Sequence, residues 1–472
     1  MQPLAHCAAQ LKEDRHVVGY ASGNFGKAIF IGSIDVTLLF LLTDVIGMAP
    51  LHVSLLMLVM LLGDLVFDLG AGVFAARLEQ RGIGYPRLIG CAVLPCAGAF
   101  GMLYALPLLQ VERFALVAAL LLLLRGAFAL IDVPHNSLLA RVTQDSHARG
   151  RASGYRTLFS SAASVVVAVV IAPAMNLGDA GNAPLRLFWL GVGAGLLFCA
   201  TLLLAAWSSR ASGSARPVRA ARAAALWPRP DRLFSAFAAV AVITGFAIPM
   251  FGKTLLYLCT YVLHQPGFAG QVLLTLALSQ IAGASLWIVL VRRHDKTQLL
   301  AASHALAAIG ITLFACAGEQ RTLLLACAAL AGIGLAGVFM LPWGILADIV
   351  DFSEFRYRDR RETLAFATTL VLLKASGAAA FATIGWMLGQ LGYVAGAAQP
   401  PAVLLGLKLL ACGVPVLGSG IAIAILLRME IGHALHARVH RLNRMRPGRQ
   451  RDCLRPSPDA ASLFCPPQRP RT

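Results

Sequence analysis

Long apolar runs recur along almost the whole chain, and they constrain its fold more than any other feature. Each is long enough to cross a bilayer core as an α-helix. Only 13% of the 472 residues are charged and 58% are hydrophobic, whereas a soluble domain is about one quarter charged. The sequence therefore predicts an all-α membrane protein and excludes an ordinary soluble enzyme or a disordered chain. We place twelve membrane-spanning runs, at residues 18–43, 51–74, 87–109, 114–139, 153–177, 186–208, 234–262, 268–291, 299–316, 322–346, 362–391 and 402–427.

Lysine and arginine residues are distributed unevenly between these runs. If both termini are cytoplasmic, the cytoplasmic segments hold 32 of the 40, and the opposite loops hold three, Arg113, Arg186 and Arg321. Cytoplasmic loops of membrane proteins carry an excess of these residues. The pattern predicts both termini inside, in a bacterial-type inner membrane. It also explains the net charge of +18 by topology and contact with lipid, without nucleic acid as a partner.

The segment 209–233, rich in Arg, Ala, Pro and Ser, separates the runs into two sets of six. We expect a six-helix bundle over 1–208, a cytoplasmic linker over 209–233, a second bundle over 234–428 and a basic, largely disordered tail over 429–472. Two parallel six-helix repeats with a substrate site between them resemble the major facilitator superfamily.

Two carboxylates lie four residues apart in the second run, Asp64 and Asp68. This spacing places both on one helix face. Charges inside a membrane are costly and often mark an ion or substrate path. A close pair of carboxylates can bind a cation or hold a proton. The alternative is a structural ion pair with Lys27 or Arg125.

Two further charges lie deep in the runs, Asp132 and Lys374. Asp132 can accept hydrogen bonds from a polyol, or it can pair with Arg125, seven residues earlier on about the same face. Lys374, near the midplane, requires an acid or an anionic ligand. Because the acids lie in the first set of runs, pairing with one of them would link the two sets.

A cluster of charges follows the tenth run. Asp348, Asp351 and Glu354 recur at three-residue spacing, and Arg360 and Arg361 come shortly after them. This is either a solvated loop or a set of charge locks that closes the cytoplasmic side. Exposed ion pairs are common and contribute little to stability, which favours neither reading decisively.

Motifs for other functions are missing from the sequence. There is no P-loop and no nucleophile–base motif, so we expect neither an ATP-driven pump nor an enzyme. The ten cysteines are scattered, mostly in apolar runs, and indicate small core residues rather than a metal site. We expect no cofactor beyond a coupling ion, H⁺ or Na⁺, and a monomer that binds a small solute.

Several stretches that carry these charges resemble the glycoside–pentoside–hexuronide:cation symporters, the melibiose-carrier group of the major facilitator superfamily. The resemblance covers nearly the whole chain, and the order of the stretches is more specific than any one of them. They are Gly19-Tyr-Ala-Ser-Gly-Asn-Phe-Gly26-Lys27, Thr43-Asp44-Val-Ile-Gly47, Gly63-Asp64-Leu-Val-Phe-Asp68, Asp132-Val-Pro134 with Tyr155-Arg156, and Leu346-Ala-Asp348-Ile-Val-Asp351-Phe-Ser-Glu354 through Arg361-Glu362 to Lys374.

The resemblance implies a role for each charged residue that matches it. It implies that Asp64 and Asp68 bind the coupling cation. It also implies that the sugar and coupling site contains Asp132, Arg156 and Lys374, with Lys27 as the lysine of the first span.

The chain departs from the melibiose carrier at four positions. A second acid after the first-span lysine is Ala28, and a sugar-stacking tryptophan is Asn136. An asparagine between the two second-span acids is Phe67, and a threonine ligand is Ala129. Na⁺ needs several oxygen ligands, whereas a proton needs one carboxylate, so these departures favour H⁺.

The sequence thus predicts a secondary transporter that couples movement of a sugar or glycoside across the inner membrane to H⁺ by alternating access, without indicating the direction of transport. Substrate or coupling contacts are expected at Lys27, Asp132, Asn136, Arg156 and Lys374. Loss of the stacking tryptophan also fits an amphipathic cargo such as a lysolipid. A non-transporting scaffold or receptor is a third possibility, but it would gain little from costly buried charges.

Overall fold

The computed structural model describes residues 15–142, 146–175, 182–210, 231–291, 293–357 and 362–429. Within these ranges the regular elements are all helical, and twelve helices are long and apolar enough to cross a membrane. Each corresponds to one predicted run, so the prediction of twelve spans is confirmed. The first six are α2 (Arg15–Phe40), α3 (Pro50–Gln80), α4 (Tyr85–Leu109), α5 (Phe114–Val142), α6 (Ser146–Val166) and α7 (Ala183–Ser208).

The remaining spans form the second half of the molecule. The tenth is longer than predicted, because its helix continues far past residue 346 through the acidic segment. These six are α8 (Arg232–Tyr257), α9 (Ala269–Leu290), α10 (Lys296–Cys316), α11 (Arg321–Tyr357), α12 (Glu362–Gln390) and α13 with α14 (Pro401–Lys408 and Val414–Leu426).

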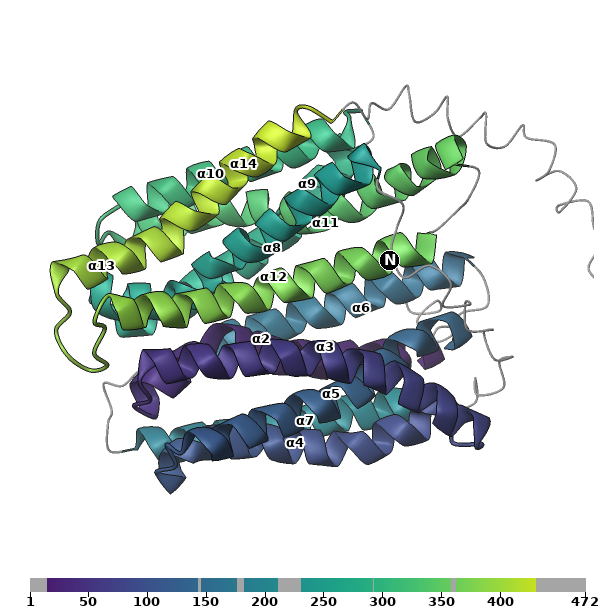
Figure 1. Ribbon diagram of the computed structural model, residues 1–472, viewed down its shortest axis with the longest axis horizontal. Helices are drawn as coiled ribbons and strands as arrows, with labels where there is room; N and C mark the ends of the chain where they lie inside the picture. The colour runs from purple at the N-terminus through teal and green to yellow at the C-terminus, as the bar shows by residue number, and fades with distance from the viewer. Residues whose placement is uncertain are drawn as a thin grey trace, which may run out of the picture.

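The two halves lie side by side with their helices along the long axis of the molecule. Figure 1 shows α2 to α7 in purple and blue on one side and α8 to α14 in teal to yellow on the other. Large apolar side chains remain exposed around the bundle, as lipid-facing helices require. Among them are Leu94, Leu196, Leu278 and Leu417.

The same internal packing is repeated in each half. In the first, α2 packs on α6 and α7, α4 packs on α5 and α7, and α3 packs on α5. In the second, α8 packs on α12 and α14, α10 packs on α11 and α14, and α9 packs on α11. Each contact thus recurs six spans later, which is the arrangement that parallel six-helix repeats predict.

In the described ranges the halves touch at α3 with α12, at α2 with α8, and where α6 and the π-helical turn η2 (Val167–Ile171) pack on α9. At one of these approaches a Cβ on Gly385 of α12 would lie 3.1 Å from backbone atoms of Ser54 in α3. The Ser54 hydroxyl donates to the carbonyl oxygen of Ala382 at 2.7 Å. A glycine is needed at residue 385 because a side chain would meet the facing backbone.

The first helix of each half ends in the same way. A π-helical turn closes each, η1 (Leu41–Val45) after α2 and η6 (Leu258–Val262) after α8. A residue with positive φ then turns the chain, Gly47 (φ 85°) in one and His264 (φ 51°) in the other. Corresponding residues are 217 positions apart, the separation of Asp44 and Tyr261. We name this end of the bundle the Asp44 end.

Candidate functional site

Four of the predicted site residues form one hydrogen-bonded cluster in the first half. Lys27 of α2 donates to Asp132 Oδ1 of α5 at 2.8 Å and to Asn136 Oδ1 at 3.1 Å. Asn136 Nδ2 donates to Asp132 Oδ1 at 3.1 Å, and Arg156 of α6 donates to Asn136 Oδ1 at 2.7 Å. Asn136, which stands where the melibiose carrier has a tryptophan, therefore connects the other three. Asp132 pairs with Lys27 and not with Arg125.

The charges in this cluster do not cancel. Lys27 is 5% exposed, and Asp132 compensates its charge. Arg156 has two amide partners, Asn136 and, at 3.0 Å from its Nε, the Oδ1 of Asn24. Among the described residues no carboxylate forms an ion pair with Arg156. The cluster thus keeps one net positive charge on the Arg156 guanidinium.

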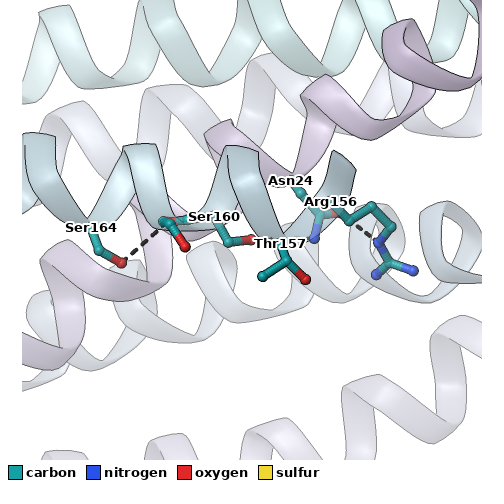
Figure 2. Close-up of a pocket in the computed structure, with 6 residues that line it drawn as sticks. Asn24, Arg156, Thr157, Ser160 and Ser164 are labelled. Carbon is teal, nitrogen blue, oxygen red and sulfur yellow. Dashed lines mark hydrogen bonds between the residues drawn. The ribbon is translucent and has the colours of Figure 1, made fainter. Parts of the chain in front are cut away.

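A small polar pocket of about 370 Å³ lies beside this guanidinium. Figure 2 shows its side chains on one stretch of α6, with Asn24 reaching in from α2. Ser164 donates to the carbonyl oxygen of Ser160 at 3.1 Å. Because each hydroxyl can also accept a hydrogen bond, the pocket suits a polar ligand. Its lining residues are Asn24, Arg156, Thr157, Ser160, Ser161 and Ser164.

A larger cavity of about 780 Å³ lies between the two halves. It shares Thr157, Ser161 and Ser164 with the polar pocket, so the two spaces adjoin along α6. Most of its other lining side chains are apolar and come from α8, α9 and α11, for example Ile248, Leu276 and Phe339. A few polar groups in a mostly apolar concavity are typical of small-molecule sites.

The two carboxylates of α3 have separate partners. Asp64 accepts two hydrogen bonds from the Arg125 guanidinium of α5, within the first half. Asp68 accepts from Lys374 of α12, across the halves. The sequence left open an ion pair between Asp64 and Arg125, and the structure contains it. It also contains the expected contact between Lys374 and an acid of the first half.

The residues around these carboxylates offer few further oxygen ligands. Phe67 stands between the two acids in sequence, and its ring packs against Gly126 of α5. Ala129 is buried and has no polar side-chain atom. A bare metal ion at Asp68 would therefore compete with the Lys374 ammonium for a single carboxylate, which is a poor Na⁺ site.

Sequence reasoning missed a second ion pair between the halves. Lys253 Nζ of α8 lies 2.7 Å from Asp35 Oδ1 of α2. The ammonium also lies over the ring of Phe381, 3.2 Å from its centroid. In the sequence each residue is a single charge within an apolar run. Neither suggests its partner before the helix contacts are known.

A hydrogen-bonded clasp joins the halves at the Asp44 end. Asp44 accepts from the hydroxyls of Tyr261 and Tyr393, both in the second half. Thr43 and Tyr257 bond hydroxyl to hydroxyl at 2.6 Å. A signal for this clasp exists in the sequence, because residues 41–48 (LLTDVIGM) and 258–265 (LCTYVLHQ) share a pattern.

The predicted charge locks lie on a helix rather than in a loop. Asp348, Asp351 and Glu354 are in the last three turns of α11. Asp348 binds Lys296 of α10 at 2.7 Å, which is a contact within the second half. Arg360 and Arg361 lie outside the described residues. Closure of the cytoplasmic side by these residues stays a prediction.

Comparison with known protein families assigns the chain to one of them. The family described as MFS/sugar transport protein matches residues 19–433. The chain belongs to this family. It is accordingly a multi-pass membrane transporter of the major facilitator type, and its resemblance to the glycoside–pentoside–hexuronide group is confirmed.

Individual relatives are distant but match over most of their length. The inner membrane symporter YicJ of Escherichia coli is 24% identical and covers 80% of this chain and 82% of its own. The glucuronide carrier protein homolog of Escherichia coli is 25% identical, over 84% of this chain and 89% of its own length. These relatives and the twelve spans agree with the predicted inner-membrane location.

Solved structures share the fold at low identity. The nucleoside transporter NupG has a TM-score of 0.61 at 13% identity, over 88% of this chain and all of its own. A bacterial homologue of the iron transporter ferroportin has a TM-score of 0.59 at 15% identity, over 88% and 98%. At this identity they support the fold alone.

Proposed function

We propose that the chain is a proton-coupled symporter that imports a sugar or glycoside by alternating access. The observation that carries this proposal is the Arg156 guanidinium, which faces a hydroxyl-lined pocket without a carboxylate partner. A half-buried cation without an acid is costly in a membrane protein, and such charges often mark a place where a ligand binds. The adjoining cavity between the halves supplies the route.

Asp68 is the proposed proton site. Its pair with Lys374 is the more exposed of the two, with 30% and 48% of the side chains accessible, whereas Asp64 and Arg125 are 16% and 20% exposed. A proton on Asp68 would remove the charge that holds Lys374 and so weaken a tie between the halves. Asp64, held by two hydrogen bonds from Arg125, would keep α3 and α5 in register.

The cargo would bind at the cluster of Lys27, Asp132, Asn136 and Arg156. Carboxylate and amide oxygens accept hydrogen bonds from sugar hydroxyls, and the guanidinium binds a planar acid through two parallel bonds. The uncompensated charge on Arg156 favours a sugar that carries an acidic group. One relative, the glucuronide carrier protein homolog of Escherichia coli, is named for a sugar of this kind.

Alternating access would use the ties between the halves. The Asp44 end is closed by the clasp, and the predicted topology assigns that end to the periplasm. Binding of proton and cargo would favour the state in which these ties exchange for ties at the other end. Linkage then requires that the proton tighten cargo binding and that cargo raise proton affinity.

The test is the external pH of de-energised cells that overproduce the protein. A panel of methyl glycosides of glucose, galactose, xylose and glucuronic acid is added in sodium-free medium. We expect transient alkalinisation, largest with the glucuronide. Asp68→Asn should abolish it because the proton site is gone. Glu112→Gln, an acid in an exposed loop away from the site, should leave it unchanged.

Arg156→Gln provides the specificity arm of this experiment. It should reduce the response to methyl glucuronide by about a hundredfold, since hydrogen bonds to a charged group contribute up to about 3 kcal/mol. The response to methyl glucoside should fall far less. Alkalinisation that persists in Asp68→Asn, or that is absent for every glycoside, contradicts proton–sugar symport.

A second candidate cargo is an amphipathic solute such as a lysolipid. The largely apolar lining of the 780 Å³ cavity favours it. Uptake of a fluorescent lysolipid into vesicles that contain the purified protein, compared with uptake of the glycosides, decides between the two.

A further inference from the structure

Among the described residues, Asp35 is the one charged residue that lines the cavity between the halves. Half of its side chain is exposed, while its partner Lys253 is 7% exposed. Only Oδ1 is bonded to Lys253, and Oδ2 has no hydrogen-bond partner within the described ranges. Oδ1 thus binds the buried Lys253 ammonium, and Oδ2 is open to the cavity.

The pair of Asp35 and Lys253 has more contacts than an ion pair that only holds two helices together would need. Lys253 is fixed on two sides, by the carboxylate at 2.7 Å and by the face of the Phe381 ring. Replacing a buried ion pair by apolar groups is often neutral or stabilising, and charges inside a membrane protein usually serve a substrate or ion path. The half-exposed carboxylate is therefore presented to the cavity.

The position of Asp35 sets how far a ligand must extend. Asn24 lines the polar pocket and Asp35 lies eleven residues further along α2. At the rise of an α-helix this separates them by about 16 Å. Thr157, Ser161 and Ser164 belong to both spaces and provide hydroxyls between the two ends. A single pyranose ring is too short to reach from one end to the other.

We propose that Asp35, positioned by Lys253, is a cargo-binding residue and that the cargo is longer than a monosaccharide. This rests on the proposed function, whose site takes the first sugar unit. The open oxygen of Asp35 would accept hydrogen bonds from hydroxyls of a second sugar unit. Because Lys253 already balances the carboxylate charge, this end selects a neutral polyhydroxylated unit rather than an amine.

The test measures binding to purified full-length protein by the shift in its thermal unfolding. The probes are the methyl glycosides above and four disaccharides: cellobiose, lactose, maltose and an aldobiouronic acid. At least one disaccharide should bind more tightly than its methyl monosaccharide. Asp35→Asn should raise the apparent Kd of that disaccharide about tenfold, as loss of a charge-assisted bond predicts, and leave the monosaccharide unchanged.

A double variant separates binding from structure. Asp35→Asn with Lys253→Met removes both charges, so no buried ammonium is left unpaired. It should bind the disaccharide as weakly as Asp35→Asn alone. Recovery of wild-type affinity would overturn the proposal and make the pair structural. Glu79→Gln with Arg141→Met removes an ion pair of the first half that does not line the cavity, and it should keep wild-type affinity.

The remaining outcomes are also decisive. If wild-type protein binds no disaccharide, or binds none better than a monosaccharide, the proposal is wrong. Disaccharide binding that depends on Asp35, without alkalinisation in cells, would reject proton symport and keep this inference. Alkalinisation by a disaccharide with the same KM in wild type and Asp35→Asn would support proton symport and reject the binding role of Asp35.

Discussion

The first helices of the two halves have the same construction and different chemistry. Both α2 and α8 have 26 residues, both end in a five-residue π-helical turn, and both turn the chain with a positive φ. With the separation of 217, Lys27 corresponds to Thr244 and Asp44 to Tyr261. The shared part is apolar patterning and turn geometry, and the unshared part is charge.

The surroundings of the equivalent positions differ in the same sense. Lys27 lies in a charged cluster next to a polar pocket. Thr244 lies in a buried neutral group, with its hydroxyl 3.4 Å from His304 Nε2. One copy of the repeat thus carries the charged cluster of the proposed site, while the other carries a neutral hydrogen-bonded group. This asymmetry distinguishes the site from the scaffold.

The largest expected effect comes from neutralising equivalent residues. Lys27→Met leaves the Asp132 carboxylate without its ion partner, which costs about 3–5 kcal/mol when a buried pair is broken. We expect glycoside-dependent alkalinisation to fall more than about a hundredfold. Thr244→Val removes one neutral hydrogen bond, worth about 1 kcal/mol, and should retain most transport. Equal losses in the two variants, at matched protein levels in the membrane, would contradict the division of roles.

The sequence supports prediction unevenly across this site. Twelve spans follow from apolar runs, and single charges such as Lys27 and Lys374 are visible because charge in a membrane is rare. The partners of Asp64 and Asp68 are harder to predict. A spacing of four places both acids on one face of α3. However, α3 contacts both α5 and α12, and the two acids bind partners on different helices, Asp64 on α5 and Asp68 on α12.

Contacts between distant helices are the part that spacing cannot supply. The pair of Asp35 and Lys253 joins residues 218 positions apart, and only the crossing of α2 and α8 brings them together. The clasp at Asp44 is an intermediate case. Its repeated octapeptide is readable in the sequence and indicates two equivalent turns, but that the turns touch each other is a property of the packed halves.

A smaller effect is expected from the clasp itself, where the two equivalent residues Asp44 and Tyr261 meet. Asp44→Leu leaves the hydroxyls of Tyr261 and Tyr393 without their acceptor, at a cost of about 1–3 kcal/mol. The Asp44 end should then open more often. Cys259, fully buried in η6, reports this: in a variant that keeps only this cysteine, we expect alkylation by N-ethylmaleimide to be about tenfold faster.

The matched change on the other copy sharpens this comparison. Tyr261→Phe removes one of the two tyrosine bonds and leaves Tyr393 on Asp44, so labelling of Cys259 should accelerate by less than in Asp44→Leu. If neither variant changes the rate, the clasp does not hold this end closed.

The smallest effect concerns the turns after η1 and η6, where the two copies differ only in how they tolerate a positive φ. A Cβ on Gly47 would have no heavy atom within 4 Å, so Gly47→Ala tests backbone strain without a clash. It should lower the free energy of unfolding by about 1–2 kcal/mol.

His264 already bears this strain and is exposed. His264→Gly should therefore raise the free energy of unfolding by up to about 1 kcal/mol, offset in part by the entropy of a glycine in the unfolded chain. Thermal unfolding of the purified protein in detergent measures both. Opposite signs would show that the turn geometry is common to the two halves and that the residue is not. A loss in both variants would mean that the His264 side chain contributes contacts of its own, and the equivalence of the two turns would then hold for the backbone only.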